Sequence, residues 1–167
     1  MEATKEALIK AMESYFGEDT KRISHAHRVT AYAEQLMGRE EGDYQVVIGA
    51  AVLHDIGIHQ AEKKYGSASG KYQEIEGPPI AREILTGLKF KKGRIDEICE
   101  IIAHHHSPGK INTQNFKILY DADWLVNLKD EYDIQDRDKL VNIIDRVFLT
   151  ESGRSLARQT YLPELSQ

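Results

Sequence analysis

An almost wholly apolar run, residues 46–53 (VVIGAAVL), leads directly into a histidine and an aspartate, His54 and Asp55. A helix that is apolar on every side has no face to turn to water, so this run predicts a buried helix. Gly57 predicts the end of that helix. Because a carboxylate taken out of water must be paired or must coordinate an ion, the run carries two chemically demanding side chains into the protein interior.

The adjacent imidazole and carboxylate have two interpretations. They are either a hydrogen-bonded pair that caps an ordinary core helix, or ligands of a metal ion. The negative end of the helix dipole also favours a cation at this position. The dipeptide alone does not decide between the two.

The size and charge of the chain exclude several classes of protein. At 167 residues it is long enough for one well-developed hydrophobic core and short for two. A net charge of −5 argues against general binding to nucleic acid or to an anionic membrane surface. We find neither a signal-peptide pattern nor an apolar stretch of membrane-spanning length. The single cysteine, Cys99, agrees with a reducing cytoplasm, while the sequence does not indicate an oligomeric state.

Long segments with a helical period predict an all-α protein. Proline is tolerated in the first turn of a helix, so Pro78 and Pro79 are expected to open one. Besides the buried run, helices are expected, in chain order, at residues 4–16, 22–39, from 78 onward, 94–106, 114–129, 138–149 and 152–161.

The helix expected over residues 22–39 contains two histidines that face opposite ways. His25 shares a stripe with Val29 and Leu36, which follow it by four and eleven residues. His27 lies about 200° further round the helix and therefore faces solvent. Arg22, one turn before His25, points the same way as His25. A single histidine on an apolar face is more often a core residue than a ligand, so His25 needs partners to be read as functional.

Residues 58–71 follow the histidine and aspartate and become rich in glycine, serine and lysine. This composition predicts an exposed, mobile loop. Lys63 and Lys64 in this loop could hold a phosphate group close to His54 and Asp55. An ordinary solvated loop explains the same composition.

Three consecutive histidines end the helix expected over residues 94–106. The apolar face leads to His105, which follows Ile101 by four residues and Ile102 by three. His106 lies on the flank of this face and His104 points away. Which of the three histidines is functional stays open at this point.

Two acids lie in the strongly apolar helix expected over residues 114–129. Asp123 shares a stripe with Phe116 and Val126, whereas Asp121 shares one with Ile118 and Leu125. Either carboxylate needs a partner in such surroundings. Periodicity does not choose between them.

These residues occur in an order, H…HD…D, that resembles the HD superfamily of metal-dependent phosphohydrolases. Residues 25–29 (HAHRV) resemble the family's H-x-x-R-V segment, and residues 51–57 (AVLHDIG) its A-x-L-H-D-I-G segment. Residues 119–125 (LYDADWL) resemble its D-A-D-x-L segment, in which the second acid is the metal ligand. The resemblance runs from about residue 22 to residue 128.

The resemblance implies a single HD-type helical domain over residues 1–167, with a metal-binding core at about 22–128 and packing helices at about 138–161. It implies one divalent ion held by His25, His54, Asp55 and Asp123, and this ligand set suits Mn²⁺, Fe²⁺, Co²⁺, Ni²⁺ or Zn²⁺. Asp55 is then the acid that orients or deprotonates the attacking water. Arg22 matches a basic position that contacts substrate phosphate in some members.

Members with two metal ions carry further histidines. One of them resembles the turn at residues 106–110, with His105 beside it. Another precedes a glycine by four residues, where this chain has Gln73. We therefore expect one tightly held ion, with His105 and His106 facing substrate or weakly binding a second ion.

The expected function is hydrolysis of a phosphate ester or anhydride of a nucleotide or similar small metabolite, with Arg22, Lys63 and Lys64 binding the phosphate. A di-iron oxygenase of the HD type is an alternative, against which Gln73 counts. The second alternative is a regulatory module that binds a nucleotide and a metal without catalysis. The expected partner is thus a small phosphorylated molecule.

Overall fold

The computed structural model describes residues 2–165, which form nine α-helices, one short 3₁₀ helix and no strand. The all-α prediction is therefore confirmed. The helices are α1 (Lys5–Phe16), α2 (Thr20–Met37), α3 (Tyr44–Leu53), α4 (Ile58–Tyr65), α5 (Gly70–Gly87), α6 (Lys92–His104), α7 (Gln114–Glu131), α8 (Arg137–Val147) and α9 (Glu151–Tyr161), followed by η1 (Pro163–Leu165).

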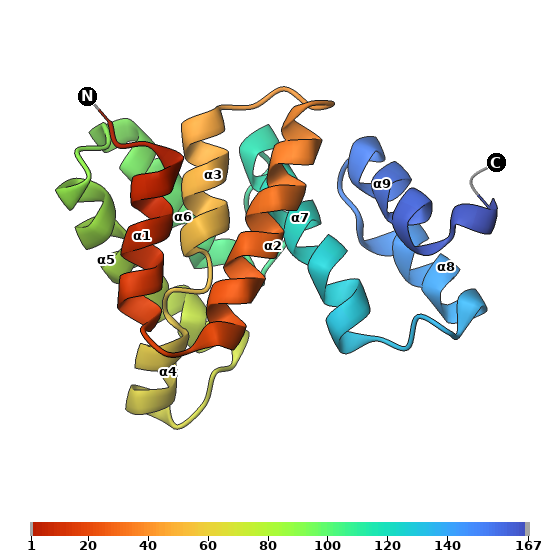
Figure 1. The fold of residues 1–167 in the computed structure, drawn as a ribbon, viewed down its shortest axis with the longest axis horizontal. Coiled ribbons are helices and arrows are strands. Elements are labelled where there is room, and N and C mark those ends of the chain that lie inside the picture. The colour runs from red at the N-terminus through yellow and green to blue at the C-terminus, as the bar shows by residue number, and fades with distance from the viewer. Residues whose placement is uncertain (1, 166–167) are drawn as a thin grey trace.

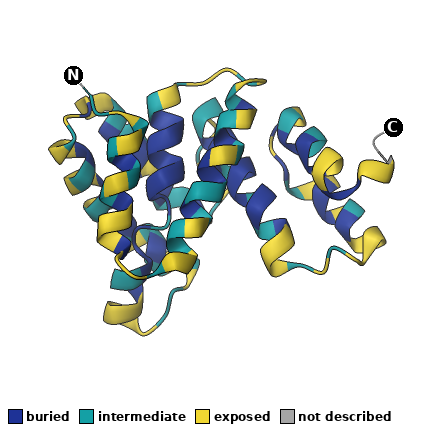
Figure 2. Ribbon diagram, viewed as in Figure 1, coloured by how far each residue is buried: buried dark blue, intermediate teal, exposed yellow. Residues whose placement is uncertain are grey.

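Helix α3 lies at the centre of the fold, and every residue from Val46 to Leu53 is buried. It is enclosed by α1, α2, α6 and α7, as the burial colours show (Figure 2). Gly49 permits the close approach of α6, because a Cβ atom there would lie 2.6 Å from the Ile98 side chain. The buried helix predicted from the apolar run is confirmed, but it ends at Leu53, and Gly57 lies directly before α4 instead of ending α3.

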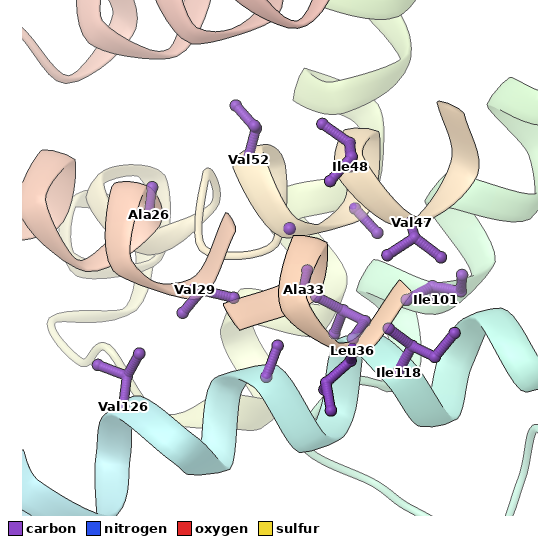
Figure 3. Close-up of a cluster of buried hydrophobic side chains, with 14 of the residues drawn as sticks. Ala26, Val29, Ala33, Leu36, Val47, Ile48, Val52, Ile101, Ile118 and Val126 are labelled. Carbon is purple, nitrogen blue, oxygen red and sulfur yellow. The ribbon is translucent and has the colours of Figure 1, made fainter. Parts of the chain in front are cut away.

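Helix α2 packs its apolar stripe against α3 and α7. Val29, Ala33 and Leu36 are fully buried, and Figure 3 shows them facing side chains of α3, α6 and α7. The helix begins at Thr20, two residues earlier than expected, because the Asp19 side chain caps it by accepting a hydrogen bond from the backbone N–H of Arg22.

The loop expected from the glycine, serine and lysine content in the second half of residues 58–71 is confirmed only for residues 66–69, and placing Lys63 and Lys64 in it was wrong. Residues 58–65 form α4, which ends at Gly66 in the left-handed conformation, and only the short stretch before Gly70 is irregular. Ile58 and Ala61 are buried, so packing of one apolar face stabilises a helix whose other side is charged. Lys63 and Lys64 therefore lie in the last turn of a helix instead of a mobile loop.

The start expected for the next helix was also wrong. Helix α5 begins at Gly70 and contains Pro78 and Pro79 in its interior. Proline there removes backbone hydrogen bonds. Packing compensates, because Gly77 lies against both the Gly57 backbone and the Ile102 side chain.

Helices α8 and α9 form a pair beside the main bundle, next to α7 (Figure 1). Asp121 of α7 joins them to it by accepting hydrogen bonds from the backbone N–H groups of Leu149 and Thr150 and from the Thr150 hydroxyl. Thr150 in turn caps α9. Within residues 2–165, none of the helices is both long and apolar enough to cross a membrane.

Candidate metal centre

The turn that follows α3 positions His54 and Asp55. The His54 ring is completely buried, and its Nδ1 lies 2.8 Å from the Ala51 carbonyl oxygen. A carbonyl only accepts hydrogen bonds, so Nδ1 carries the proton and Nε2 presents its lone pair. Nε2 lies 3.3 Å from Asp55 Oδ2. The backbone thus fixes the tautomer that a metal ligand requires.

His25 and Asp123 meet this pair from α2 and α7. His25 Nε2 lies 3.3 Å from His54 Nε2, 3.3 Å from Asp55 Oδ2 and 3.0 Å from Asp123 Oδ1. Asp123 Oδ1 is 3.4 Å from His54 Nε2. The ligand atoms of His25, His54 and Asp55 therefore all lie within 4.8 Å of one another, and Asp123 joins this group through its contacts with the two histidines.

These separations fit a shared divalent ion. Ligand atoms about 2.1 Å from an ion are about 3.0 Å apart in octahedral and about 3.4 Å apart in tetrahedral geometry. The measured distances span this range. The lone pair of His54 faces two carboxylate oxygens, which is an arrangement that requires positive charge between them. The donor set thus fits the metal that the sequence indicates.

The electrostatics of the cluster show the same demand for positive charge. Burial opposes protonation of His54, but the charges of Asp55 and Asp123 outweigh it and hold the pKa of His54 well above its ordinary value. Burial would raise the pKa of Asp123, yet His54 and His25 lower it well below the ordinary value. A metal ion bound between these groups would supply the positive charge that the two carboxylates favour.

The two acids of α7 lie in different surroundings. Asp123 is part of the cluster, whereas Asp121 is fully buried and directed toward the connection between α8 and α9. Burial raises the pKa of Asp121 to about 6, against the hydrogen bonds from Leu149 and Thr150 that lower it. Asp121 thus holds α7 to the connection between α8 and α9, whereas Asp123 faces the two histidines.

A second group of possible ligands lies on the other side of Asp55. His105, just after α6, has its Nδ1 2.6 Å from the Ile102 carbonyl oxygen, so Nδ1 carries the proton. Its Nε2 lies 3.3 Å from Asp55 Oδ1 and is buried without a hydrogen-bond partner. Ligand atoms of Asp55, His105 and His106 all lie within 4.8 Å of one another. His104 is bonded to the Glu100 carbonyl oxygen instead.

Gln73 forms a hydrogen bond with the His106 ring. Gln73 Nε2 donates to the Ala68 carbonyl oxygen at 2.7 Å, which leaves Gln73 Oε1 as the acceptor that lies 3.1 Å from His106 Nε2. His106 Nε2 therefore carries a proton. Desolvation and the adjacent His105 lower the pKa of His106 to about 4, so the ring is neutral at pH 7. The second group consequently offers fewer free ligand atoms than the first.

A cavity of about 630 Å³ opens above the cluster. His25, Asp55 and Asp123 line it, and His54 lies buried beneath them. Arg22 also lines it, with its Nη2 3.6 Å from Glu62 Oε1 and its Nε buried without a hydrogen-bond partner.

Lys63 and Lys64 are not among the described residues that line this cavity. Both side chains are exposed on α4, and Lys64 Nζ lies 3.5 Å from Glu76. The structure thus brings together Arg22 and the proposed metal ligands, but leaves these two lysines outside.

The sequence interpretation gave no role to six polar residues of the cavity, namely Lys21, Ser24, Arg28, Asn127, Asp130 and Glu131. Helical spacing could have found two of them, since Asn127 and Glu131 follow Asp123 by four and eight residues and so share its face. Burial and the charge of Asp123 raise the pKa of Glu131.

His27 provides a test of the helical stripe. Its side chain is 42% exposed, and its Nε2 lies 3.0 Å from Glu13 Oε2. We expect His27→Gln to keep the metal content and to change the free energy of unfolding by less than about 1 kcal/mol, since an exposed ion pair contributes little. Metal analysis and urea unfolding measure both quantities. Loss of metal in this variant would contradict the assignment of His25 as the inward histidine.

Comparisons with known proteins agree with this geometry. The family model described as HD domain matches residues 22–148. The chain is similar to the crystal structure of a predicted HD superfamily hydrolase from an uncultured Thermotogales bacterium, with 27% sequence identity and a TM-score of 0.68. That match covers 94% of this chain and 86% of the other. A search among curated proteins gives no match.

Proposed function

Because the chain belongs to the HD domain family, a superfamily of metal-dependent hydrolases, we propose that it is a phosphohydrolase. Its substrate is a phosphate ester or anhydride of a nucleotide or similar small metabolite. The observation that carries this proposal is the convergence of His25, His54, Asp55 and Asp123 at the floor of a cavity that also contains Arg22.

A divalent ion bound there supplies Lewis acidity, which lowers the pKa of water and polarises a phosphoryl oxygen. The protein supplies the remaining functions. Asp55 lines the cavity and can orient the attacking water and accept its proton. Arg22 offers a guanidinium group with an unpartnered Nε to the phosphate oxygens. The Ala51 carbonyl keeps His54 in the tautomer that binds metal.

The proposal includes one tightly held ion, chosen from Mn²⁺, Fe²⁺, Co²⁺, Ni²⁺ and Zn²⁺. Gln73 supports the choice of a single ion, because its side-chain oxygen accepts a hydrogen bond from His106 Nε2 and so removes that atom as a ligand. The same contact argues against the di-iron oxygenase, which needs two complete ligand sets. Complete primary ligands argue for catalysis over a purely regulatory role. A cytoplasmic location remains part of this proposal and depends on the single cysteine, Cys99, whose thiol is free and buried.

The decisive experiment couples metal analysis to a phosphatase screen. The purified protein is analysed for metal, treated with a chelator, reloaded with each candidate ion, and assayed for phosphate release from p-nitrophenyl phosphate, nucleotides and sugar phosphates. We expect about one ion per chain and activity that chelation abolishes and one ion restores. If no phosphorylated compound is hydrolysed with any of the ions, the phosphohydrolase proposal is wrong and the regulatory role is favoured.

Arg22 provides a prediction about the phosphate. We expect Arg22→Ala to reduce kcat/KM for p-nitrophenyl phosphate about tenfold to a hundredfold, the effect of losing a charged hydrogen bond of roughly 1.5–3 kcal/mol. Metal content and melting temperature should barely change, because the contact of Arg22 with Glu62 is long and partly exposed.

Lys64→Ala is the matched control, since Lys64 is a nearby cation outside the cavity. Its effect should be smaller than that of Arg22→Ala and should vanish at high salt. An Arg22→Ala protein that loses metal or unfolds would show that Arg22 is instead a structural ion-pair partner.

A further inference from the structure

The cavity has two chemically different ends, with the proposed metal ligands between them. On α2, Arg22 and Arg28 lie one turn before and one turn after His25, each about 4.5 Å away along the helix axis. Arg22 is directed toward α4, where it approaches Glu62. Arg28 is directed toward the end of α7, where it forms a bidentate pair with Asp130 at 2.9 and 3.1 Å.

The Arg22 end carries positive charge that suits one phosphate group. Within residues 2–165, the Lys21 side chain makes no ion pair, and the Arg22 guanidinium forms one long ion pair with Glu62 while its charge also acts on the Asp19 carboxylate. Arg28 is neutralised by Asp130. Two available cations match the charge of a phosphomonoester, whereas a triphosphate carries about twice that charge and would extend toward the acids of α7.

The α7 end offers acceptors and an amide. Asn127, Asp130 and Glu131 line the cavity there, and Asp130 is already paired with Arg28. Among the described residues, neither the Asn127 amide nor the Glu131 carboxylate has a hydrogen-bond partner. A carboxylate accepts hydrogen bonds and an amide both donates and accepts, which is the combination that binds neighbouring hydroxyl groups.

The cavity offers almost nothing to a flat apolar ring. Of its lining residues within the described chain, Ile58 alone is apolar, and the aromatic rings are those of His25 and His106. His106 packs against His105, at 4.0 Å between ring centroids, and against Gly70, where a Cβ atom would lie 2.8 Å from the ring. His25 is held within the ligand cluster. Base-binding sites in proteins typically present open aromatic or apolar surface, and this site does not.

We propose that the substrate is the phosphomonoester of a small polyhydroxylated compound, a sugar or a polyol without a nucleobase. This inference depends on the proposed function and narrows its substrate. The phosphate lies at the ligand cluster and the Arg22 end, and the hydroxyl groups bind Asn127 and Glu131. The oxygen of water bonds to phosphorus as the bond from phosphorus to the sugar oxygen breaks. The sugar oxygen takes up one proton, water gives up another, and the products are inorganic phosphate and the free alcohol.

A pair of substrates that differ only by the base tests this inference. Ribose 5-phosphate and adenosine 5′-monophosphate present the same phosphate on the same sugar carbon. The metal-loaded enzyme should hydrolyse ribose 5-phosphate with a kcat/KM at least tenfold above that for adenosine 5′-monophosphate. Glucose 6-phosphate and glycerol 3-phosphate distinguish a sugar from a short polyol, and p-nitrophenyl phosphate reports phosphatase activity in general.

The outcomes separate this inference from the proposed function. If p-nitrophenyl phosphate is hydrolysed but adenosine 5′-monophosphate is preferred to every sugar and polyol phosphate tested, the inference is overturned and the phosphohydrolase stands. If p-nitrophenyl phosphate and all the other compounds resist hydrolysis with every ion, the proposed function itself fails.

Variants at the α7 end supply an independent measurement. Asn127→Ala and Glu131→Ala should each raise KM for ribose 5-phosphate about tenfold and lower the ratio of its kcat/KM to that of p-nitrophenyl phosphate. Glu100→Ala is the matched control, because Glu100 is exposed on α6 and lies outside the cavity. An unchanged ratio in both variants, at an unchanged melting temperature, would contradict the assignment of these residues to the hydroxyl groups.

Discussion

Asp123→Ala will leave the purified protein without bound metal, and its phosphatase activity will fall by more than two orders of magnitude. Asp123 Oδ1 lies 3.0 Å from His25 and 3.4 Å from His54, so its removal deletes one of four convergent ligands. Removing a residue that only hydrogen-bonds to a metal ligand already lowers metal affinity or activity by about 10–100-fold. Removing the ligand itself lowers them further. Elemental analysis and turnover of p-nitrophenyl phosphate measure the two effects.

Asp121→Ala is the control, because Asp121 belongs to the same helix and is also a buried acid. This variant should keep its metal but lose about 2–4 kcal/mol of stability, since it leaves three donors from Leu149 and Thr150 unpaired. The melting temperature should fall by roughly 5–15 °C. If Asp121→Ala loses metal while Asp123→Ala retains it, the wrong carboxylate has been assigned as the ligand.

Gly57→Ala will destabilise the protein by about 3 kcal/mol or more. A Cβ atom at this position would lie 2.6 Å from the backbone nitrogen of Gly77, 2.8 Å from its Cα and 2.9 Å from the Gln73 carbonyl oxygen. All three atoms belong to the α5 backbone and cannot rotate away as a side chain could. The turn or α5 must shift, and we expect metal retention to fall together with stability, because Asp55 lies two residues away.

Gly87→Ala tests whether the effect comes from the clash or from the loss of a glycine. Gly87 ends α5, and a Cβ atom there would meet nothing within 4 Å. This variant should be as stable as the natural protein or up to about 1 kcal/mol more stable, because alanine restricts the unfolded chain. Thermal and urea unfolding of both variants provide the comparison. Equal stability of the two variants would show that the approach of Gly57 to Gly77 has no energetic importance.

The features that the sequence predicted correctly are local ones. Residues 46–53 are apolar on every side, and such a segment is stable in water only when other elements enclose it. The orientation of His25 followed from the spacing of Val29 and Leu36, because helical geometry fixes which residues share a face. The ordered H…HD…D segments indicated the HD domain family, and the family model over residues 22–148 confirms it.

The two errors of local structure arose where packing outweighed a local signal. The Lys63–Lys64 segment has the composition of a loop, but Ile58 and Ala61 bury one side of it and hold it as a helix. Pro78 and Pro79 are typical of a helix start, yet α5 continues through them because its neighbours fix its backbone. Propensity is a weak preference, and burial of an apolar face is a larger free energy.

The sequence by itself therefore determined the all-helical class, the buried central helix and the HD domain family, and the metal ligands remain a prediction from that resemblance. Helical period left Asp121 and Asp123 equivalent, and the family resemblance alone favoured Asp123; the tertiary structure shows that Asp123 meets His25 and that Asp121 holds the connection between α8 and α9. The tertiary structure also shows that the α5 backbone leaves no room for a side chain at Gly57. It further shows that Lys21, Asn127 and Glu131 share a cavity with Arg22. The physical reason is that helical period fixes directions only within one helix. What lies opposite a side chain depends on how separate helices cross, and this is set by the packing of the whole core.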